Sequence, residues 1–343
     1  MNIRKVLIII DYKGFFCSKQ KSYIYRGGMD IPLLLSYFKQ KGFEVSVTSF
    51  SNINFKTILE QSPLILYTSS EDKNGFYKSY IEDIIFQLEE SGIFVIPAFK
   101  YLKAHDNKVA MELLRISSDL DSIKSIKSRI FGTIEELIEN KDSIIYPAVI
   151  KSASGSMSKG VAKADTPEQL VQKAKIISST HNFTHDLKEI LRSIKYKKEY
   201  VRESFYRKKF IVQNMIPGLL NDWKVLVYGN RCYALYRGVR DNDFRASGSG
   251  KFEFRKELPE GMLDFAYSIK EYFNVPNISL DIGFDGEKFH LIEFQFLYFG
   301  TKTLEKSQFY FERIKDQWIV KDEKSCLEEV YVKSVINYIN NCK

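Results

Sequence analysis

The chain has 343 residues, 44% hydrophobic and 27% charged, which is enough apolar content to bury the core of one large domain or of two to three small ones. Its net charge of +8 suits a phosphorylated or acidic ligand but is too diffuse to argue for nucleic acid. The four cysteines lack CxxC spacing, the N-terminus lacks a signal-peptide core, and no apolar run approaches the roughly 20 residues of a membrane span. We therefore expect reduced thiols and a cytoplasmic protein.

Strand-like and helical patterns alternate over the first 100 residues. Residues 5–10 are a continuous apolar, β-branched run, which is typical of a strand buried on both faces. Further strands are predicted at 44–48, 64–67 and 94–97, and helices from Asp30 and over 77–90. This alternation predicts a doubly wound α/β domain. Gly27 and Gly28 could expose backbone N–H groups to an anion, but a plain turn is favoured because no GxGxxG pattern accompanies them.

A lysine and a loop of small residues follow the next predicted strand. Residues 146–151 are an apolar strand ending at Lys151, and residues 152–160 are mostly Ser, Ala and Gly. Small residues let the backbone wrap closely over phosphates, and the lysine supplies a point charge to them. The loop lacks the GxxxxGK[ST] pattern, so it is not a P-loop, and a mobile surface loop is the alternative. Upstream, Lys108 heads an apolar-periodic helix.

Positive charge gathers in two further segments. Residues 192–209 are basic and rich in tyrosine, for which a solvated helix face is the commoner meaning and a binding patch the alternative. Residues 240–250 place Arg240 and Arg245 among glycines and serines. A flexible loop with two arginines favours an anion-handling element.

A hairpin is predicted at residues 222–237, with Gly229-Asn230 at its tip. Lys224 and Arg237 would then lie near the strand ends distal from the tip, where both could approach one ligand. Helices are predicted at 166–179, 259–273 and 325–340, and the last is amphipathic, which indicates packing on the core.

A second hairpin is predicted at residues 279–295, around the turn signal Asp285-Gly286. Period-two alternation places Glu293 and Gln295 on one face, and Asp281 joins them if the loop has an odd number of residues. Two carboxylates and an amide oxygen would form a site suited to Mg²⁺ with a nucleotide triphosphate. The alternative is that Asp281 and Glu293 are ordinary solvated strand residues.

Together these motifs resemble the ATP-grasp superfamily, which includes D-alanine–D-alanine ligase, glutathione synthetase and the ribosomal-protein glutamyl ligases. The motif pattern is nearest to the glutamyl ligases and covers 108–295. The resemblance implies an N-terminal α/β domain at 1–104, a central subdomain at 105–212 and a C-terminal subdomain with the magnesium site at 213–343. The two subdomains, each α+β, would grip ATP between them.

The resemblance also implies a role for each matching residue. The nucleotide-binding set is Lys108, Lys151, Ser154, Gly155, Ser156, Gly160, Gln213, Asn214, Met215, Ile216 and Asp222. The magnesium set is Asp281, Glu293 and Gln295, and Arg245 faces the reacting phosphate with Lys224 as a further cation. Arg237, placed beside Lys224 by the predicted hairpin, is expected to join these two as a catalytic residue. Asn214 stands where the glutamyl ligases often have Glu, Lys224 where the family has Arg, and Gln295 where it normally has Asn.

The implied activity is an ATP- and Mg²⁺-dependent carboxylate–amine ligase that forms an amide through an acyl phosphate and releases ADP and phosphate. Two alternatives stay open: a kinase of the same fold that phosphorylates a hydroxyl, and a non-catalytic protein that senses nucleotide or binds nucleic acid through residues 192–209.

The expected partners are a small carboxylate and an amine, with amino acids, peptides, sugar acids and a protein tail all open. No nucleic acid and no membrane are expected. The oligomeric state is left open, with a homodimer as one option.

Overall fold

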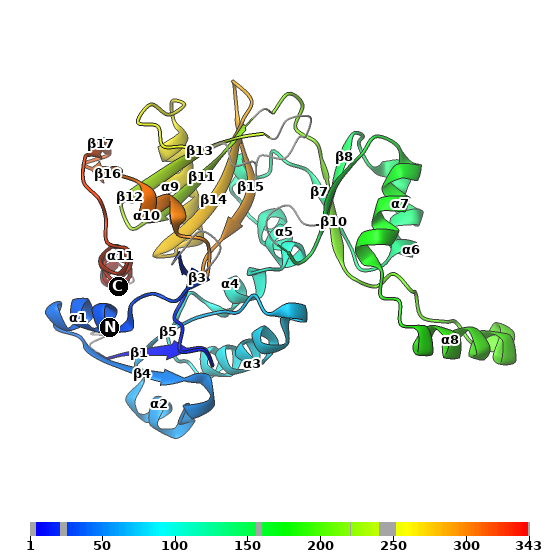
Figure 1. The fold of residues 1–343 in the computed structure, drawn as a ribbon, viewed down its shortest axis with the longest axis horizontal. Helices are drawn as coiled ribbons and strands as arrows, with labels where there is room; N and C mark the ends of the chain where they lie inside the picture. The colour runs from blue at the N-terminus through cyan, green and yellow to red at the C-terminus, as the bar shows by residue number, and fades with distance from the viewer. Residues whose placement is uncertain (1–4, 21–25, 156–159, 220, 240–251, 342–343) are drawn as a thin grey trace. The chain divides into compact units, whose positions relative to one another are not determined.

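The computed structural model describes residues 5–20, 26–155, 160–219, 221–239 and 252–341 (Figure 1). The chain forms two compact units, one made of Met1–His105 with Leu219–Lys343 and the other of Asp106–Gly218. The predicted mixture of helices and sheets is confirmed. Within the described ranges no helix is long and apolar enough to cross a bilayer.

The N-terminal part of the first unit is a parallel sheet with strand order β4-β1-β5-β6. Its strands are β1 (Lys5–Ile10), β4 (Glu44–Ser49), β5 (Leu64–Tyr67) and β6 (Val95–Ile96), and its helices are α1 (Ile31–Gln40), α2 (Phe55–Gln61), α3 (Phe76–Glu90) and α4 (Phe99–Ala104). Every residue of β5 is buried, as its continuous apolar run predicts. The chain leaves β1 first to one side and later to the other, which is the predicted doubly wound order.

The C-terminal part of the first unit is an antiparallel sheet with order β15-β14-β11-β12-β16-β17, and β13 pairs with β12. Its strands are β11 (Asn221–Tyr228), β12 (Arg231–Gly238), β13 (Phe252–Glu253), β14 (Asn277–Phe284), β15 (Phe289–Gln295), β16 (Tyr310–Ile314) and β17 (Gln317–Lys321). Its helices are α9 (Met262–Phe273), α10 (Lys302–Lys306) and α11 (Leu327–Asn341). Both predicted hairpins, β11–β12 and β14–β15, are confirmed.

One hydrophobic core joins the two sheets of the first unit. Val6 and Ile8 of β1 share it with Leu226 of β11 and with Val330 and Val335 of α11. The C-terminal helix was predicted to pack on the core, and this is confirmed. Its apolar side chains pack in a core that both sheets share.

The second unit is an antiparallel sheet with order β7-β10-β8-β9, and its described residues also form four α-helices. Its elements are α5 (Lys108–Ile116), β7 (Ser128–Phe131), α6 (Ile134–Asn140), β8 (Ala148–Ser152), β9 (Val161–Ala164), α7 (Pro167–Ser178), α8 (Phe183–Tyr196) and β10 (Phe210–Asn214). Short elements complete the chain: β2 (Lys19–Gln20), β3 (Arg26–Gly27), and the 3₁₀ turns η1 (Phe50–Asn52), η2 (Lys73–Gly75), η3 (Asp121–Ile123), η4 (Lys141–Ser143) and η5 (Lys197–Glu199).

The core of the second unit lies on one face of its sheet. Ile150 and Val212 are paired in the register of β8 with β10, and both pack with Leu170 of α7. By alternation, Lys151 and Gln213 therefore lie on the opposite face. Helix α8 stands apart from α6 and α7 (Figure 1).

Candidate active site

A row of charged residues crosses four neighbouring strands of the large antiparallel sheet. Asp222 lies opposite Arg237 in the register of β11 with β12, and Lys224 lies opposite Asp281 of β14. Asp281 in turn lies opposite Glu293 of β15. Directly opposed residues share a face, and Asp222 and Lys224 alternate onto the same one, so all five line one face of the sheet.

A β-bulge in β15 places Asp281 and Glu293 on the same face of the sheet. The turn between the strands has four residues, since Phe284 pairs with Phe289, and an even count would send Asp281 to the face opposite Glu293. The register then shifts by one, because Ile282 pairs with Leu291 while Asp281 pairs with Glu293. The residue inserted by the bulge restores the common face.

The charged row is held by ion pairs. Asp281 lies 3.2 Å from Lys224 Nζ and 2.8 Å from a terminal nitrogen of Arg237, whose Nε donates to Asp222. Burial alone would raise the pKa of Asp281, but the two cations outweigh it and hold that pKa well below its usual range. Burial raises the pKa of Asp222 to about 6 against the opposing effect of Arg237. Both carboxylates are therefore largely ionised at neutral pH, and Asp222 is the one that takes up a proton first as the pH falls.

Arg237 keeps unused donor capacity. Its Nη2 is at ion-pair distance from Asp281, but among the described residues it makes no hydrogen bond of acceptable geometry. A buried guanidinium with an unsatisfied N–H is costly unless another acceptor approaches. An oxygen-rich anion would satisfy it.

The predicted magnesium residues suit a hard cation. Gln295 lies on the same face as Glu293, and its Nε2 donates to Glu293 Oε1 at 3.4 Å. The set holds only two carboxylates, and in the described parts of the chain no three His, Cys, Asp or Glu side chains gather as metal ligands. Mg²⁺ usually takes one or two carboxylates and completes its shell with phosphate oxygens and water, so the residues present fit it.

Lys108 is tied to the glycine-containing loop of the second unit. Its backbone N–H donates to Ala153 O at 2.7 Å and its Nζ to Gly155 O at 2.9 Å. Asp106 Oδ1 accepts the Gly155 N–H at 2.7 Å. The start of α5 and the beginning of the loop are therefore brought together, as two parts of one predicted nucleotide site should be.

The ends of the loop form the base of the β8–β9 hairpin. Lys151 pairs with Val161 in its register, and the Ser152 N–H donates to Gly160 O at 2.9 Å. Ser152 Oγ donates to Ser154 O at 2.7 Å. Gly160 has φ +71° and a Cβ there would lie 2.3 Å from Ser152 Oγ, so only glycine fits this position.

The predicted adenine-edge strand is the end of β10. The Gln213 side chain is buried and donates to Glu112 Oε1 at 3.0 Å, so it is used in packing. The backbone N–H groups of Asn214 and Met215 donate at 3.0 and 3.1 Å to Lys127 O and Pro147 O. Neither amide is available to an adenine ring in this arrangement.

Ile216, also predicted to bind the nucleotide, follows β10 and is half-buried. Ser156 and Arg245, predicted for phosphate binding and catalysis, lie outside the described residues.

A polar cluster around the buried Ser69 and His105 was not predicted from the sequence. Ser69 Oγ lies 2.8 Å from His105 Nδ1, Glu71 Oε1 lies 3.7 Å from His105 Nε2, and the rings of His105 and Tyr298 are 5.6 Å apart. Tyr298 has φ +56°, the left-handed region that a bulky residue rarely adopts. The cluster follows β5, next to the point where strand order reverses, and open α/β sheets bind ligands at such points. The available signal was the polar run 68–71 directly after a buried strand.

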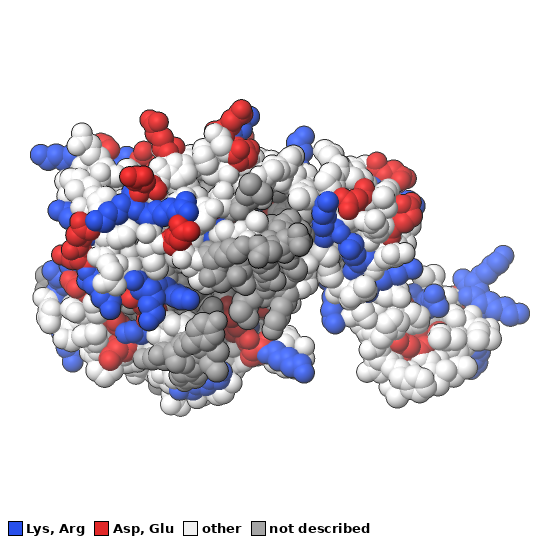
Figure 2. Space-filling view, turned by 45° about the horizontal axis from the view of Figure 1, so that its top comes forward, with Lys and Arg blue, Asp and Glu red and all other residues white. Residues whose placement is uncertain are grey.

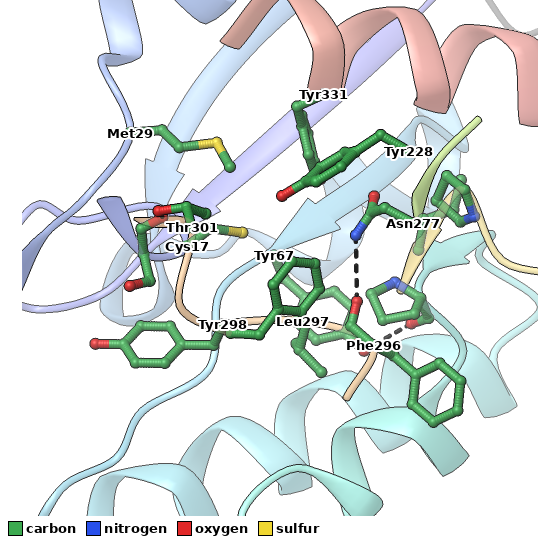
Figure 3. A pocket seen from close by; sticks show the side chains of 15 residues that line it. Cys17, Met29, Tyr67, Tyr228, Asn277, Phe296, Leu297, Tyr298, Thr301 and Tyr331 are labelled. Atoms are coloured by element: carbon green, nitrogen blue, oxygen red, sulfur yellow. Dashed lines mark hydrogen bonds between the residues drawn. The ribbon is translucent and has the colours of Figure 1, made fainter. Parts of the chain in front are cut away.

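A small cavity lies in the first unit among Cys17, Tyr228, Asn277 and Tyr331 (Figure 3). Its volume is about 20 Å³, which is room for one water molecule. Asn277 Oδ1 and Ser18 Oγ, which line it, have no hydrogen-bond partner among the described residues, and one water would satisfy such atoms. Burial raises the pKa of the Cys17 thiol to about 12, so this cysteine is not a nucleophile near neutral pH.

No family model and no curated protein matches the chain. Solved structures do. D-cycloserine synthetase DcsG superposes with a TM-score of 0.55 at 10% identity, over 97% of this chain and 99% of that one. The ATP-grasp ligase PsnB, complexed with a minimal precursor, gives 0.51 at 11% identity over 98% and 100%. The chain has the ATP-grasp fold.

The ATP-grasp match extends over the N-terminal domain as well as the motifs. The macrocyclase MdnC from Microcystis aeruginosa MRC, bound with precursor peptide MdnA, gives a TM-score of 0.50 at 11% identity over 97% of this chain and 99% of that one. The predicted resemblance is confirmed at the level of fold. At 10–11% identity, the likeness shows the fold of the chain.

Proposed function

We propose that the protein is an ATP- and Mg²⁺-dependent carboxylate–amine ligase. The observation that carries the proposal is the charged row, in which Asp281 and Glu293 are paired across two strands while Lys224 and Arg237 hold the adjacent positions. Paired carboxylates beside paired cations suit a metal and the phosphate that it binds.

Each part of the row has a role in this proposal. Asp281 and Glu293 would hold the metal, with Gln295 as the third oxygen ligand. When bound, Mg²⁺ would supply positive charge to the β- and γ-phosphate oxygens of ATP. Arg237 would use its unsatisfied N–H on a phosphate oxygen, and Lys224 would neutralise charge beside it.

The second unit would bind the rest of the nucleotide. Lys151, on the sheet face opposite the core, and Lys108, tied to the loop at 153–155, would contact phosphates. Arg245 keeps the role that the family resemblance implies. Two expectations stay predictions. One is that the parts 105–212 and 213–343 hold ATP together, and the other is the three-part division with a domain at 1–104.

The reaction would begin when the substrate carboxylate attacks the γ-phosphorus of ATP and expels ADP, leaving an acyl phosphate. An amine then attacks the acyl carbon and expels phosphate, and the amide forms. The barrier is electrostatic, since two anions must approach, so the cationic side chains stabilise the transition state most. Removal of one such contact typically lowers the rate on the order of 10²–10³-fold.

Two observations concern the substrates other than ATP. Two of the structural neighbours, MdnC and PsnB, are described in complex with precursor peptides, which supports a peptide carboxylate among the open choices of amino acid, peptide and sugar acid. The cluster of Ser69, Glu71 and His105 offers polar groups at the switch point of the α/β sheet. We propose that the second substrate binds there.

The test is product analysis after incubation of the protein with ATP, Mg²⁺ and pooled acids and amines. We expect substrate-dependent ADP and free phosphate, lost in Lys151→Ala and Glu293→Ala. Lys175→Ala and Glu287→Ala, at exposed positions of α7 and the β14–β15 turn, serve as matched controls. Phosphate left on a hydroxyl acceptor would instead identify a kinase, and full turnover in both site variants would end the ligase proposal.

A further inference from the structure

The polar face of helix α8 packs on the segment that follows the helix in the chain. Glu189 is 1% exposed and accepts hydrogen bonds from Arg192 Nη1 at 2.9 Å, from the Tyr200 hydroxyl and from the Glu203 N–H at 3.1 Å. One turn earlier, His185 contacts Glu203 at 3.3 Å. The inner side of α8 is therefore fixed by polar contacts, the reverse of an ordinary amphipathic surface helix.

The apolar face of α8 is consequently exposed. Five side chains at helical spacing form it, and we call them the α8 stripe: Phe183 (84% exposed), Leu187 (46%), Ile190 (38%), Leu191 (56%) and Ile194 (66%). From the first to the last the stripe is about 16 Å long, or three helical turns. Scattered exposed apolar residues are normal, but a contiguous stripe of this kind marks an interaction surface.

The exposed charged residues that border the stripe are lysines. Lys188 and Lys195 are exposed and lie three and four residues from Leu191, so both border the stripe. Of the two acidic residues of the helix, Glu189 is buried on the inner side, and Asp186, at the other edge of the stripe, is half-buried and accepts from His181 Nδ1 at 2.8 Å. Lys197 and Lys198 follow the helix, also exposed, and Figure 2 shows Lys and Arg side chains at the edge of this part of the surface.

We propose that the α8 stripe docks an acidic amphipathic peptide helix. Its apolar residues would pack along the stripe at i, i+3, i+4 and i+7 spacing, which is the helix-in-groove mode of recognition. Its carboxylates would meet Lys188 and Lys195. A second copy of this chain fits less well, because two stripes laid together would bring lysines of like charge side by side. The docked peptide would also carry the substrate carboxylate, and this part of the proposal rests on the proposed ligase function. The docking of the peptide does not depend on that function.

The test is a binding measurement with a fluorescein-labelled synthetic 18-residue helix that carries leucines on one face and glutamates on the other. A second peptide replaces the glutamates with lysines, and a third breaks the acidic helix with two prolines. Fluorescence anisotropy should show the acidic helix binding at least tenfold more tightly than either control. Its affinity should fall with added salt, because charge pairs are screened.

Variants of the stripe locate the binding. Leu191→Glu and Ile194→Glu change exposed side chains, so the protein should fold with an unchanged thermal midpoint and bind the acidic helix at least tenfold more weakly. Lys188→Glu combined with Lys195→Glu should abolish the preference for the acidic peptide. Ile176→Glu, at a 78%-exposed position of α7 in the same unit, should leave binding unchanged.

Three results would overturn the proposal. One is equal binding of the acidic and basic peptides, or binding that Leu191→Glu does not weaken. The second is preferential binding to phosphatidylserine vesicles, lost in Leu191→Glu, which would assign the stripe to a membrane surface. The third is a concentration-dependent dimer in sedimentation that Leu191→Glu abolishes. Failure of the ligase proposal would appear separately, as absent ATP turnover in a protein that still binds the peptide.

Discussion

Asp281 lies directly opposite Glu293, although the turn that joins their strands has an even number of residues. The bulge between Leu291 and Glu293 makes this possible and also increases the local twist of β15. The carboxylate pair therefore depends on the register of a single residue. We expect deletion of Leu291 and Ile292 together to move Glu293 and Gln295 to the other face and to abolish Mg²⁺-dependent ATP turnover, whereas deletion of Ile292 alone removes only the extra residue, leaves Glu293 opposite Asp281 and keeps turnover. Turnover assays on the two variants, with circular dichroism as a folding check, distinguish these outcomes.

Arg237 is buried between two carboxylates, so its loss should be costly. Arg237→Ala leaves Asp222 and Asp281 close together with one compensating charge fewer, and we expect the free energy of unfolding to fall by about 3–5 kcal/mol. Arg129→Ala, at an exposed position on β7, should cost under about 1 kcal/mol. Urea unfolding measures both. Equal costs would mean that the buried pairs do not hold the sheet together.

Gly160 closes the base of the phosphate loop. Gly160→Ala adds a Cβ 2.3 Å from Ser152 Oγ at φ +71°, so we expect a stability loss larger than about 1 kcal/mol and weaker ATP binding. Gly42→Ala is the matched control, since φ is +80° there and nothing lies within 4 Å of the added Cβ. The difference between their unfolding free energies isolates the steric cost. No difference would show that the loop adjusts freely.

Gln213 tests whether its side chain or only its backbone serves the nucleotide. Gln213→Ala removes a hydrogen bond to the buried Glu112, and we expect a loss of about 1–3 kcal/mol in stability with ATP affinity changed less than about threefold. Gln172→Ala, exposed on α7, should change neither quantity. Calorimetric titration with ATP would contradict this view if Gln213→Ala bound much more weakly while remaining fully folded.

Glu328 gives the fold an acid-sensitive contact. Burial raises the pKa of this carboxyl, but the Asp30 N–H and Lys19 outweigh it, so the folded pKa lies below the usual value. A carboxyl whose pKa is lower in the folded than in the unfolded protein stabilises the fold fully when the pH is above its unfolded-state pKa. This contribution is lost as the pH falls through its folded-state pKa. We expect Glu328→Gln to cost about 1.5–3 kcal/mol at pH 7 and progressively less below about pH 4. Urea unfolding across this pH range measures the difference in unfolding free energy between the wild type and Glu328→Gln. A difference that does not change with pH would contradict the prediction.

The sequence predicted the elements that carry the site better than it predicted their contacts. Lys108 was expected to head a helix, and Asn107 caps that helix by accepting from the Ala110 N–H. Lys224 and Arg237 were expected near two strand ends, and antiparallel pairing places them there. These are local properties, set by turn signals and alternation over a few residues.

Contacts between residues far apart in the sequence could not be predicted from such local patterns. Ser69 and His105 are 36 residues apart and meet only because β5 and the end of α4 reach one edge of the sheet. The basic run at 192–209 indicated a solvated face, yet α8 hides its acids and exposes its apolar residues. Charge alone could not predict this, because the polar residues that anchor α8 lie in the segment that follows it.

The first unit is built from the two ends of the chain, and this has a consequence for the order of folding. The core around Val6 and Ile8 needs Val330 and Val335, which a ribosome adds more than 300 residues later. The core around Ile150 and Leu170 is contiguous in sequence and can close as soon as β10 has emerged. During synthesis the second unit should therefore fold before α11 has been made and can pack against the α/β sheet. A chain that ends before Leu327 would leave that sheet uncovered on one side.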